Sequence, residues 1–249
     1  MFSKLIRKFN NFIHIPLTFR NWPRVILYVA SILLRGNAYR NSIGTVILRN
    51  GQSLKIRLAN TLDLGSVMET NQRKVYTPPF IQIPENAKII DVGASIGDFS
   101  IFCATYYKNA AVFCYEPMSE AFELLLENVR SNKLEGHIKP YNLAVSDKEG
   151  TIKFGDVIYK AISFRQIFEQ NKIDKCDLLK MDIEGAEYTV LLNCPADVLK
   201  TINAITMECH YFDTNNDLDN LVRYLSETGF NVKTTSMNVH KICYLYATR

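Results

Sequence analysis

"KIIDVGASIGDFSIF", residues 88–102, contains the pattern that decides the fold. An apolar run ends in Asp91, a turn with Gly93 and Gly97 follows, and apolar residues then resume at helical spacing. This succession predicts a strand, a tight loop and a helix, the arrangement that holds a nucleotide at the carboxyl end of a strand. Gly93 would permit the tight turn, and Gly97 would let the start of the helix approach the ligand closely.

A second acid narrows the kind of ligand. Glu116 ends the next apolar run, "AVFCYE" (111–116). A carboxylate at the end of the second strand can accept hydrogen bonds from both hydroxyls of a ribose. Two glycines after a strand are by themselves only an ordinary tight turn, so it is Glu116 that favours an adenosine-type ligand.

The loop does not match a dinucleotide site. Ser95 and Ser100 occupy the second and third glycine positions of G-x-G-x-x-G. Asp91 and Asp98 stand on either side of the loop and would repel a pyrophosphate. They are compatible with the ammonium and sulfonium groups of S-adenosylmethionine (SAM), although Asp98 also suits the first turn of a helix on its own account.

Strand and helix patterns alternate from residue 88 onward. The predicted strands are 88–92, 111–116, 138–145, 177–182, 204–210 and 241–248, and helices are predicted at 97–107, after Pro117 and around 218–225. Such alternation predicts an α/β fold with a mostly parallel sheet and helices on both faces. Before it, a helix at 21–35 and a hairpin at 45–58 around Asn50-Gly51 predict a cap. We therefore expect a basic cap at 1–62 and the nucleotide-binding domain at 63–249.

Composition indicates a soluble, globular chain. Hydrophobic residues make up 47% of the 249 residues and charged residues 22%. The six cysteines lie in apolar segments without metal-ligand spacing, which predicts buried, reduced thiols and a cytoplasmic location. The longest apolar run, 25–34, is shorter than the ~20 residues that span a bilayer.

Basic residues are concentrated at the N-terminus. Residues 1–62 contain ten Lys or Arg and no acid. Residues 1–13 place apolar side chains on one helical face, which suits peripheral contact with an anionic membrane surface, packing on the chain's own domain, or a mitochondrial presequence. Packing is the interpretation that we favour.

Several motifs together resemble one known family. "IIDVGASIGDFS" (89–100), "YEP" (115–117), "NLAVSDKEG" (142–150), "LLKMDIEGAE" (178–187) and "MECH" (207–210) resemble, in this order, the FkbM-type family of SAM-dependent methyltransferases. The resemblance covers roughly residues 63–249. It implies a class I methyltransferase (Rossmann-like) fold, with a seven-stranded sheet whose last strand is antiparallel. It also implies methyl transfer to a hydroxyl, commonly of a sugar in a glycan, glycolipid or glycosylated metabolite.

The resemblance also implies which residues bind the cofactor. Asp91, Gly93, Ala94 and Gly97 match the SAM loop of the family, with Ser95 where the family usually has Asn. Glu116 matches the acid that binds the ribose, and Asn142 and Ala144 match the segment near the adenine. Asp182, Glu184 and Glu187 match the signature acids after the fourth strand.

A sugar hydroxyl is a poor nucleophile, so a base is expected where the fourth and fifth strands end. We favour His210 as general base, with Asp182 or Glu184 orienting it or the acceptor. The alternative is that the acids only favour a helix dipole and that His210 is a hydrogen-bonded rim residue. Asp182, Glu184 and Glu208 are also possible Mg²⁺ ligands, but acids alone indicate a metal weakly, and no metal is predicted.

Other functions fit less well. "TPPF" (77–80) resembles a motif of amine methylation but lacks its carboxylate or amide, so a rigid turn is predicted. No clustered basic run or RNA-binding module favours nucleic acid. The predicted partner is a small-molecule or glycan acceptor. The open alternatives are a methyltransferase of RNA or protein and a SAM-binding module without activity.

Overall fold

The computed structural model describes residues 14–35, 42–58, 61–210, 217–236 and 242–249. The amphipathic pattern predicted at 1–13 therefore lies outside the described residues, as does most of the loop after the fifth strand.

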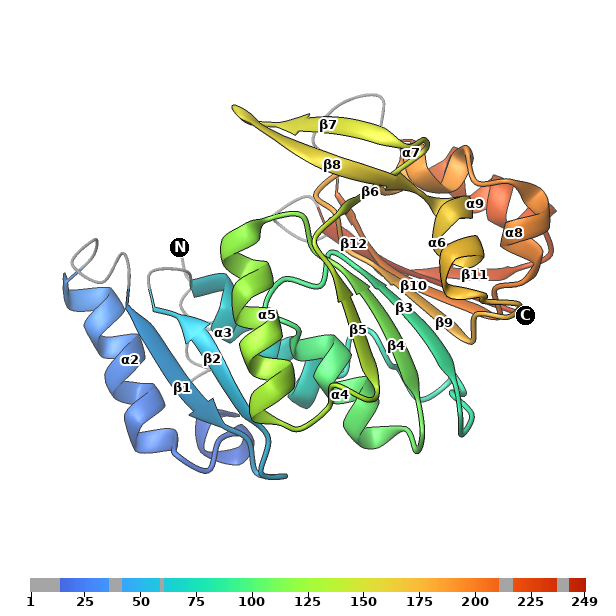
Figure 1. The fold of residues 1–249 in the computed structure, drawn as a ribbon. Helices are drawn as coiled ribbons and strands as arrows, with labels where there is room; N and C mark the ends of the chain where they lie inside the picture. Colours follow the sequence, from blue (N-terminus) through green and yellow to red (C-terminus); the bar gives the residue numbers. More distant parts are fainter. Residues whose placement is uncertain (1–13, 36–41, 59–60, 211–216, 237–241) are drawn as a thin grey trace.

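A sheet of seven strands forms the centre of the described chain (Figure 1). Its order is β11-β12-β10-β9-β3-β4-β5, and only β12 runs antiparallel to its neighbours. The bounds are β3 Lys88–Val92, β4 Ala111–Tyr115, β5 Ile138–Tyr141, β9 Leu178–Met181, β10 Ala204–His210, β11 Asn231–Thr234 and β12 Ile242–Thr248. This order, with the last strand antiparallel, confirms the predicted fold class.

Helices cover both faces of the sheet. One face carries α4 (Asp98–Tyr106) and α5 (Ser119–Ser131); the other carries α6 (Phe164–Asn171), α7 (Glu187–Leu192), α8 (Ala196–Lys200) and α9 (Leu218–Glu227) (Figure 1). Successive strand residues serve opposite faces, so Ile89 packs in the first hydrophobic cluster and Ile90 in the second. Because both faces are covered, all four residues of β9 are buried.

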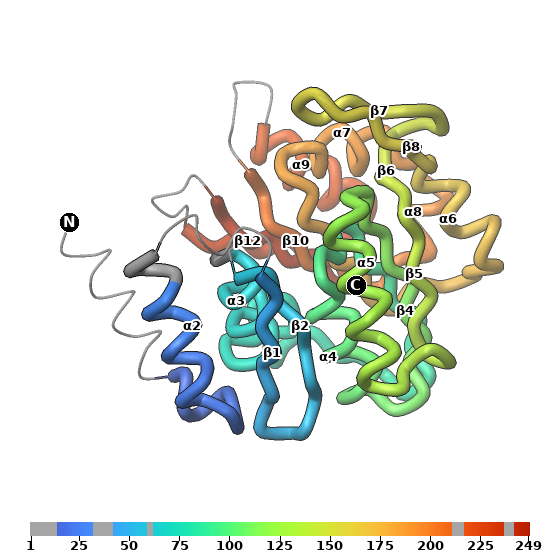
Figure 2. The backbone as a smooth tube through the Cα atoms, turned by 60° about the vertical axis from the view of Figure 1, so that its left-hand side comes forward, coloured from blue at the N-terminus to red at the C-terminus, as the bar shows by residue number. Residues whose placement is uncertain are grey.

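The cap packs against the α4 and α5 side of the sheet (Figure 2). It consists of α2 (Trp22–Arg35), β1 (Ile43–Ile47), β2 (Ser53–Arg57), α3 (Thr61–Met68) and the π-helix η2 (Glu69–Arg73). The outer edge of β2 is paired with side chains of α5: Asn128 bonds Lys55 N at 2.7 Å and Lys55 O at 3.1 Å. Cap and sheet share one hydrophobic cluster. Most of α3 and all of η2 lie beyond residue 62, and the predicted boundary at that residue stays a prediction.

The predicted third strand at 138–145 is wrong in its second half. The chain leaves the central sheet at Asn142, whose side-chain amide donates to the carbonyls of Glu116 (2.9 Å) and Pro117 (3.0 Å). The residues that follow form a separate sheet in the order β6-β8-β7, with β6 Ala144–Ser146, β7 Gly150–Phe154 and β8 Val157–Ser163. Figure 1 shows this small sheet above the carboxyl ends of the central strands.

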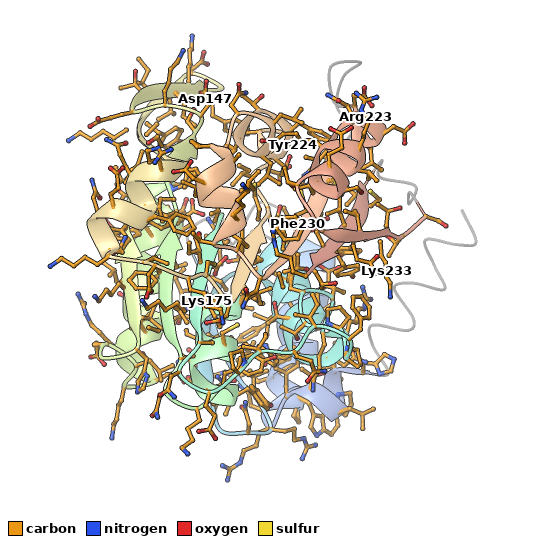
Figure 3. All side chains as sticks on the ribbon, turned by 90° about the vertical axis from the view of Figure 1, so that its right-hand side faces the viewer. Asp147, Lys175, Arg223, Tyr224, Phe230 and Lys233 are labelled. Atoms are coloured by element: carbon orange, nitrogen blue, oxygen red, sulfur yellow. The ribbon has the colours of Figure 1, made fainter. Side chains whose placement is uncertain are left out.

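Helix α9 packs against the second hydrophobic cluster, the one that contains Ile90 (Figure 3). The Tyr224 hydroxyl donates to the Cys194 carbonyl at 3.1 Å, and the Arg249 guanidinium lies 3.9 Å from the centroid of the Phe230 ring. All six cysteines are buried and none forms a disulfide, which agrees with the predicted buried thiols. Within the described ranges, no helix has the length and apolar character needed to cross a membrane.

Candidate active site

The loop after β3 is held close to the end of β9. Gly93 has φ +78°, and a Cβ atom there would lie 1.8 Å from the carbonyl oxygen of Asp182. Gly97 has φ +84° at the start of α4, and a Cβ atom there would lie 3.0 Å from Leu125 Cγ. Gly93 therefore permits the predicted turn, and Gly97 is needed for its backbone conformation and for packing against α5. Close approach of Gly97 to a ligand stays a prediction.

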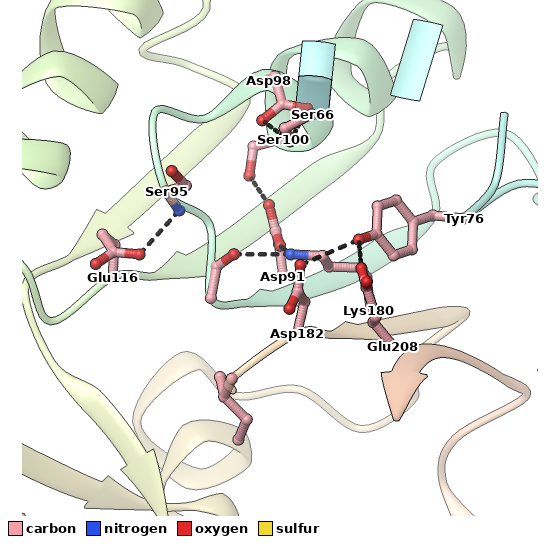
Figure 4. A network of polar contacts seen from close by, with 12 residues as sticks. Ser66, Tyr76, Asp91, Ser95, Asp98, Ser100, Glu116, Lys180, Asp182 and Glu208 are labelled. Atoms are coloured by element: carbon pink, nitrogen blue, oxygen red, sulfur yellow. Dashed lines mark hydrogen bonds and ion pairs between the residues drawn. The ribbon is translucent and has the colours of Figure 1, made fainter. Parts of the chain in front are cut away.

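Asp91 lies buried beneath the loop (Figure 4). Its carboxylate accepts a hydrogen bond from Ser100 Oγ at 2.7 Å and lies 3.2 Å from Lys180 Nζ. Lys180 also donates to the Gly93 carbonyl at 2.7 Å. This buried ion pair fixes the base of the loop, since each charge has a partner and further hydrogen bonds.

Asp98 is buried against the cap. It accepts hydrogen bonds from Thr70 (2.6 Å) and Ser66 (3.0 Å), and burial raises its pKa to about 6 despite these donors. Neither Asp91 nor Asp98 lines the cavity beside the loop. Their influence on the choice of ligand therefore stays a prediction, and any such influence would act without direct lining of the cavity.

A cavity of about 320 Å³ lies at the carboxyl ends of β3, β4 and β9. The strand ends and their loops contribute Gly93, Glu116, Met118 and Asp182, and Ala144 comes from β6 of the small sheet. The small sheet contributes a second wall, which consists of Ile152, Lys153, Phe154 and Tyr159. A largely apolar cavity with a few convergent polar groups is typical of a site for a small molecule or cofactor.

Glu116 contributes a carboxylate to the lining of this cavity. It is 6% exposed, and it accepts hydrogen bonds from Met118 N (2.8 Å) and Ser95 N (2.9 Å). Burial raises its pKa, and the two backbone donors oppose that rise. Each carboxylate oxygen keeps a free lone pair that can accept a hydrogen bond from a ribose hydroxyl, so the Glu116 carboxylate fits the ribose of SAM.

The other predicted cofactor residues have different positions. Ala144 lines the cavity, whereas Asn142 does not and instead ties the β5 end to the β4 end. Ala94 is buried within the loop, and Ser95 contributes its backbone N–H to Glu116.

The three predicted catalytic residues meet beside the cavity. His210 Nε2 lies 3.6 Å from Glu184 Oε2 and 3.9 Å from Asp182 Oδ1. Asp182 and Glu184 line the cavity, and Glu184 has the unusual φ of +55°. His210 itself is 3% exposed, and its Nδ1 lies 2.9 Å from Glu187 Oε1.

His210 is surrounded by carboxylates. Burial alone would lower its pKa, but the hydrogen bond that His210 donates to Glu187 and the charges of Glu187, Asp182 and Glu184 outweigh burial and raise the pKa to about 9. Burial also raises the pKa of Glu184. At neutral pH the ligand-free site therefore contains an imidazolium, which must lose its proton before it can act as a base.

The same residues have the spacing of a cation site. Asp182, Glu184 and His210 each offer one ligand atom within 4.8 Å of the others. The possible Mg²⁺ ligands considered from the sequence were Asp182, Glu184 and Glu208, so His210 takes the place of Glu208 in the structure. Exposed acids at such spacing are common without an ion, so the prediction of no metal remains a prediction.

Sequence reasoning missed two residues of this region. Lys180 is a charged residue within the apolar run "LLKM", and a lysine in a buried strand is a signal for a buried partner that could have been used. Tyr76, whose hydroxyl lies 3.1 Å from Asp182 Oδ2 and 3.0 Å from Glu208 Oε2, has no such signal. It precedes "TPPF", which was interpreted only as a turn.

This sheet order, with its last strand antiparallel, is that of the class I SAM-dependent methyltransferases. The chain belongs to the FkbM methyltransferase family: the Methyltransferase FkbM domain matches residues 91–232, more than half of its length. The predicted family is thereby confirmed, and its cofactor is SAM.

Individual proteins agree with this assignment. The chain is 28% identical over 170 residues to the hexuronic acid methyltransferase AglP of Haloferax volcanii. The aligned region covers 62% of this chain and 67% of AglP. It is 24% identical over 174 residues to the methyltransferase sdnD of Sordaria araneosa, covering 51% of this chain and 67% of sdnD.

Solved structures share the fold. The methyltransferase FkbM from Methylobacillus flagellatus KT superimposes with a TM-score of 0.55 at 18% identity, over 69% of this chain and 46% of that structure. The protein PH0793 from Pyrococcus horikoshii gives a TM-score of 0.51 at 15% identity, over 83% of this chain and 71% of that structure. At these identities the likeness concerns the fold alone.

Proposed function

We propose that this protein transfers the methyl group of SAM to a hydroxyl of a sugar, in a glycan, glycolipid or glycosylated metabolite. The observation that supports it best is the continuity of two sites: Asp182 and Glu184 line the cavity that contains Glu116, and both face His210. AglP, a relative at 28% identity, is described as a hexuronic acid methyltransferase, which supports a sugar acceptor.

SAM supplies an activated methyl group. The chain therefore has to bind SAM, align the acceptor hydroxyl with its methyl group, and remove the proton of that hydroxyl. Glu116 would hold the ribose, and the Gly93 loop, fixed by Lys180, would set the depth of the cofactor. Alignment of an acceptor oxygen can contribute ~7–11 kcal/mol to lowering the barrier. Asp182 and Glu184 would orient the acceptor hydroxyl.

His210 would take the proton of that hydroxyl at Nε2. A positive charge close to Asp182 and Glu184 would disfavour the imidazolium form of His210 and lower its pKa. Occupation of the cavity by positively charged SAM would therefore favour the neutral base. Glu187 holds Nδ1, which leaves Nε2 directed to the side of Asp182 and Glu184.

The decisive experiment combines binding and transfer. Calorimetry with SAM, its demethylated product and NAD should show binding of the first two only. Labelled SAM should then transfer methyl to at least one of a panel of neutral sugars and uronic acids, with RNA and protein as comparison acceptors. His210→Ala should lower turnover at least tenfold with SAM affinity retained, whereas the exposed His137→Ala serves as control.

The outcomes separate the candidate functions. Transfer to RNA or protein alone would favour a methyltransferase of another acceptor class, and SAM binding without transfer to any acceptor would favour a non-catalytic module. Turnover that survives chelation of divalent ions would support the prediction of no metal.

The basic cap supports a further part of the proposal, peripheral contact of a cytoplasmic protein with an anionic membrane surface. Leu17 and Leu27 are 68% and 67% exposed, and Arg20 and Arg24 beside them are exposed as well. Apolar side chains flanked by cations suit such a surface. Sedimentation with anionic but not zwitterionic vesicles, abolished by Leu27→Glu, would test it; no sedimentation with either kind would refute it.

A further inference from the structure

Tyr76 joins the catalytic cluster from outside the residues that match the family domain. It lies between η2 and β3 and is 4% exposed. Its ring packs edge-to-face on Phe99 of α4, with centroids 5.5 Å apart, and on Tyr244 of β12, with centroids 6.1 Å apart. Ring contacts with two separate elements, α4 and β12, therefore fix the direction of the phenol.

The phenol hydroxyl stands between two carboxylates (Figure 4). It lies 3.1 Å from Asp182 Oδ2, after β9, and 3.0 Å from Glu208 Oε2, near the end of β10. A phenol carries one hydrogen and can donate it to only one of them. The second contact is a hydrogen bond only when the other carboxyl group carries a proton and donates it to the phenol oxygen.

Glu208 is the group suited to carry that proton. Burial, followed by the charge of Asp182, raises its pKa to about 7, while His210 and the hydrogen bond from Tyr76 oppose the rise. Glu69 and Tyr244 also face this region, and Lys180 Nζ lies 5.3 Å from the centroid of the Tyr76 ring. A proton on Glu208 would allow both hydrogen bonds of a Glu208–Tyr76–Asp182 chain to form at once.

We propose that Tyr76 is a positioning residue of methyl transfer: its hydroxyl holds Asp182 in the orientation that receives the acceptor and ties Asp182 to Glu208. The inference rests on the proposed function, because Asp182 acts on an acceptor only if the protein is a transferase. Tyr76 acts through Asp182 and does not itself line the cavity that contains Glu116.

Tyr76→Phe tests the hydroxyl while keeping the ring. Turnover should fall at least tenfold, with the dissociation constant of SAM changed less than twofold. Tyr246→Phe is the matched control, because its hydroxyl donates to the neighbouring Val75 carbonyl at 2.9 Å and not to a carboxylate. The control should retain turnover within twofold.

A double-mutant cycle separates positioning from general destabilisation. If Tyr76 acts through Asp182, Tyr76→Phe should lower turnover less than twofold further when introduced into Asp182→Asn. Additive losses, a loss equal to that of Tyr246→Phe, or a parallel loss of SAM affinity would each overturn the proposal.

A measurement without turnover distinguishes this proposal from the proposed function. In carboxyl NMR, Tyr76→Phe should shift the titration of Glu208, because this carboxyl group loses its hydrogen-bond partner, whereas Tyr246→Phe should leave the titration unchanged. A wild-type protein that methylates no acceptor would refute the proposed function, with the role of Tyr76 in it, even if the titration shifts. An unshifted titration in an active enzyme would refute the role of Tyr76 alone.

Discussion

Glu187 Oε1 lies 2.9 Å from His210 Nδ1, and the same carboxylate accepts the backbone N–H groups of Ile183 (3.0 Å) and Gly185 (2.8 Å). One fully buried side chain therefore fixes both the histidine ring and the loop after β9. That loop contains Glu184 at φ +55°, a conformation that costs of order 1–3 kcal/mol and persists only where neighbours enforce it. Glu187 supplies that enforcement.

The Glu187–His210 contact predicts an unusual titration. In the ligand-free protein, His210 should titrate at a pKa of about 9, because its carboxylate partners outweigh burial. Glu187→Gln removes the first of these partners and should lower that pKa towards the ordinary value near 6.5. Histidine-ring NMR measures both, with the signal of the exposed His137 as reference. A wild-type His210 that titrates below pH 7 would contradict the assignment.

Glu116 predicts the strength of cofactor binding. Glu116→Ala should weaken SAM binding at least tenfold, about 1.4 kcal/mol, because the ribose hydroxyls lose their acceptor. Glu116→Gln keeps an oxygen for one of the backbone donors and should lose less. Calorimetry provides the dissociation constants, and Glu120→Ala, exposed in the first turn of α5, is the control. If Glu116→Ala bound SAM as the wild type does, the ribose would have to lie elsewhere.

Gly93 predicts a severe loss of stability. A Cβ atom would lie 1.8 Å from the Asp182 carbonyl oxygen, which is backbone and cannot rotate away, and φ is +78°. Gly93→Ala should therefore cost at least ~3 kcal/mol, combining steric overlap and backbone strain, or prevent folding. Gly136→Ala faces open space and should change the free energy of unfolding by less than ~0.5 kcal/mol. Urea titration that found equal stabilities would show that the loop lies farther from β9.

Sequence predicted the repeating parts of this molecule well. The strands around β3, β4, β9 and β10 follow from apolar runs that end in polar residues, and Glu116 was placed correctly because its position depends only on where β4 ends. The break at Asn142 was missed because it depends on carbonyls 25 and 26 residues away, which a local pattern does not contain.

The candidate active site was predicted only in part, because some of its features depend on contacts between residues that are distant in sequence. Asp182, Glu184 and His210 were expected to meet because parallel strands bring their carboxyl ends to one edge. The charge state of His210 was not foreseen, since it depends on the orientation of Glu187 and on burial. Tyr76 joins the cluster through contacts 106 and 132 residues away along the chain, which no spacing indicates.

Asp98 predicts a pH dependence of stability that a substitution should reverse. Burial raises its folded-state pKa to about 6 from the ordinary 3.8, so between these values the folded state binds the proton that the unfolded state has lost. Stability should therefore fall as pH rises from about 4 to 6, by roughly 3 kcal/mol for this group. Asp98→Asn mimics the protonated form beside Thr70 and Ser66, so its stability relative to wild type should increase by that amount from pH 4 to 7. Urea unfolding at several pH values measures the difference, and the exposed Asp219→Asn should show none. A constant difference between wild type and Asp98→Asn across this range would mean that Asp98 is already ionised when it folds against the cap.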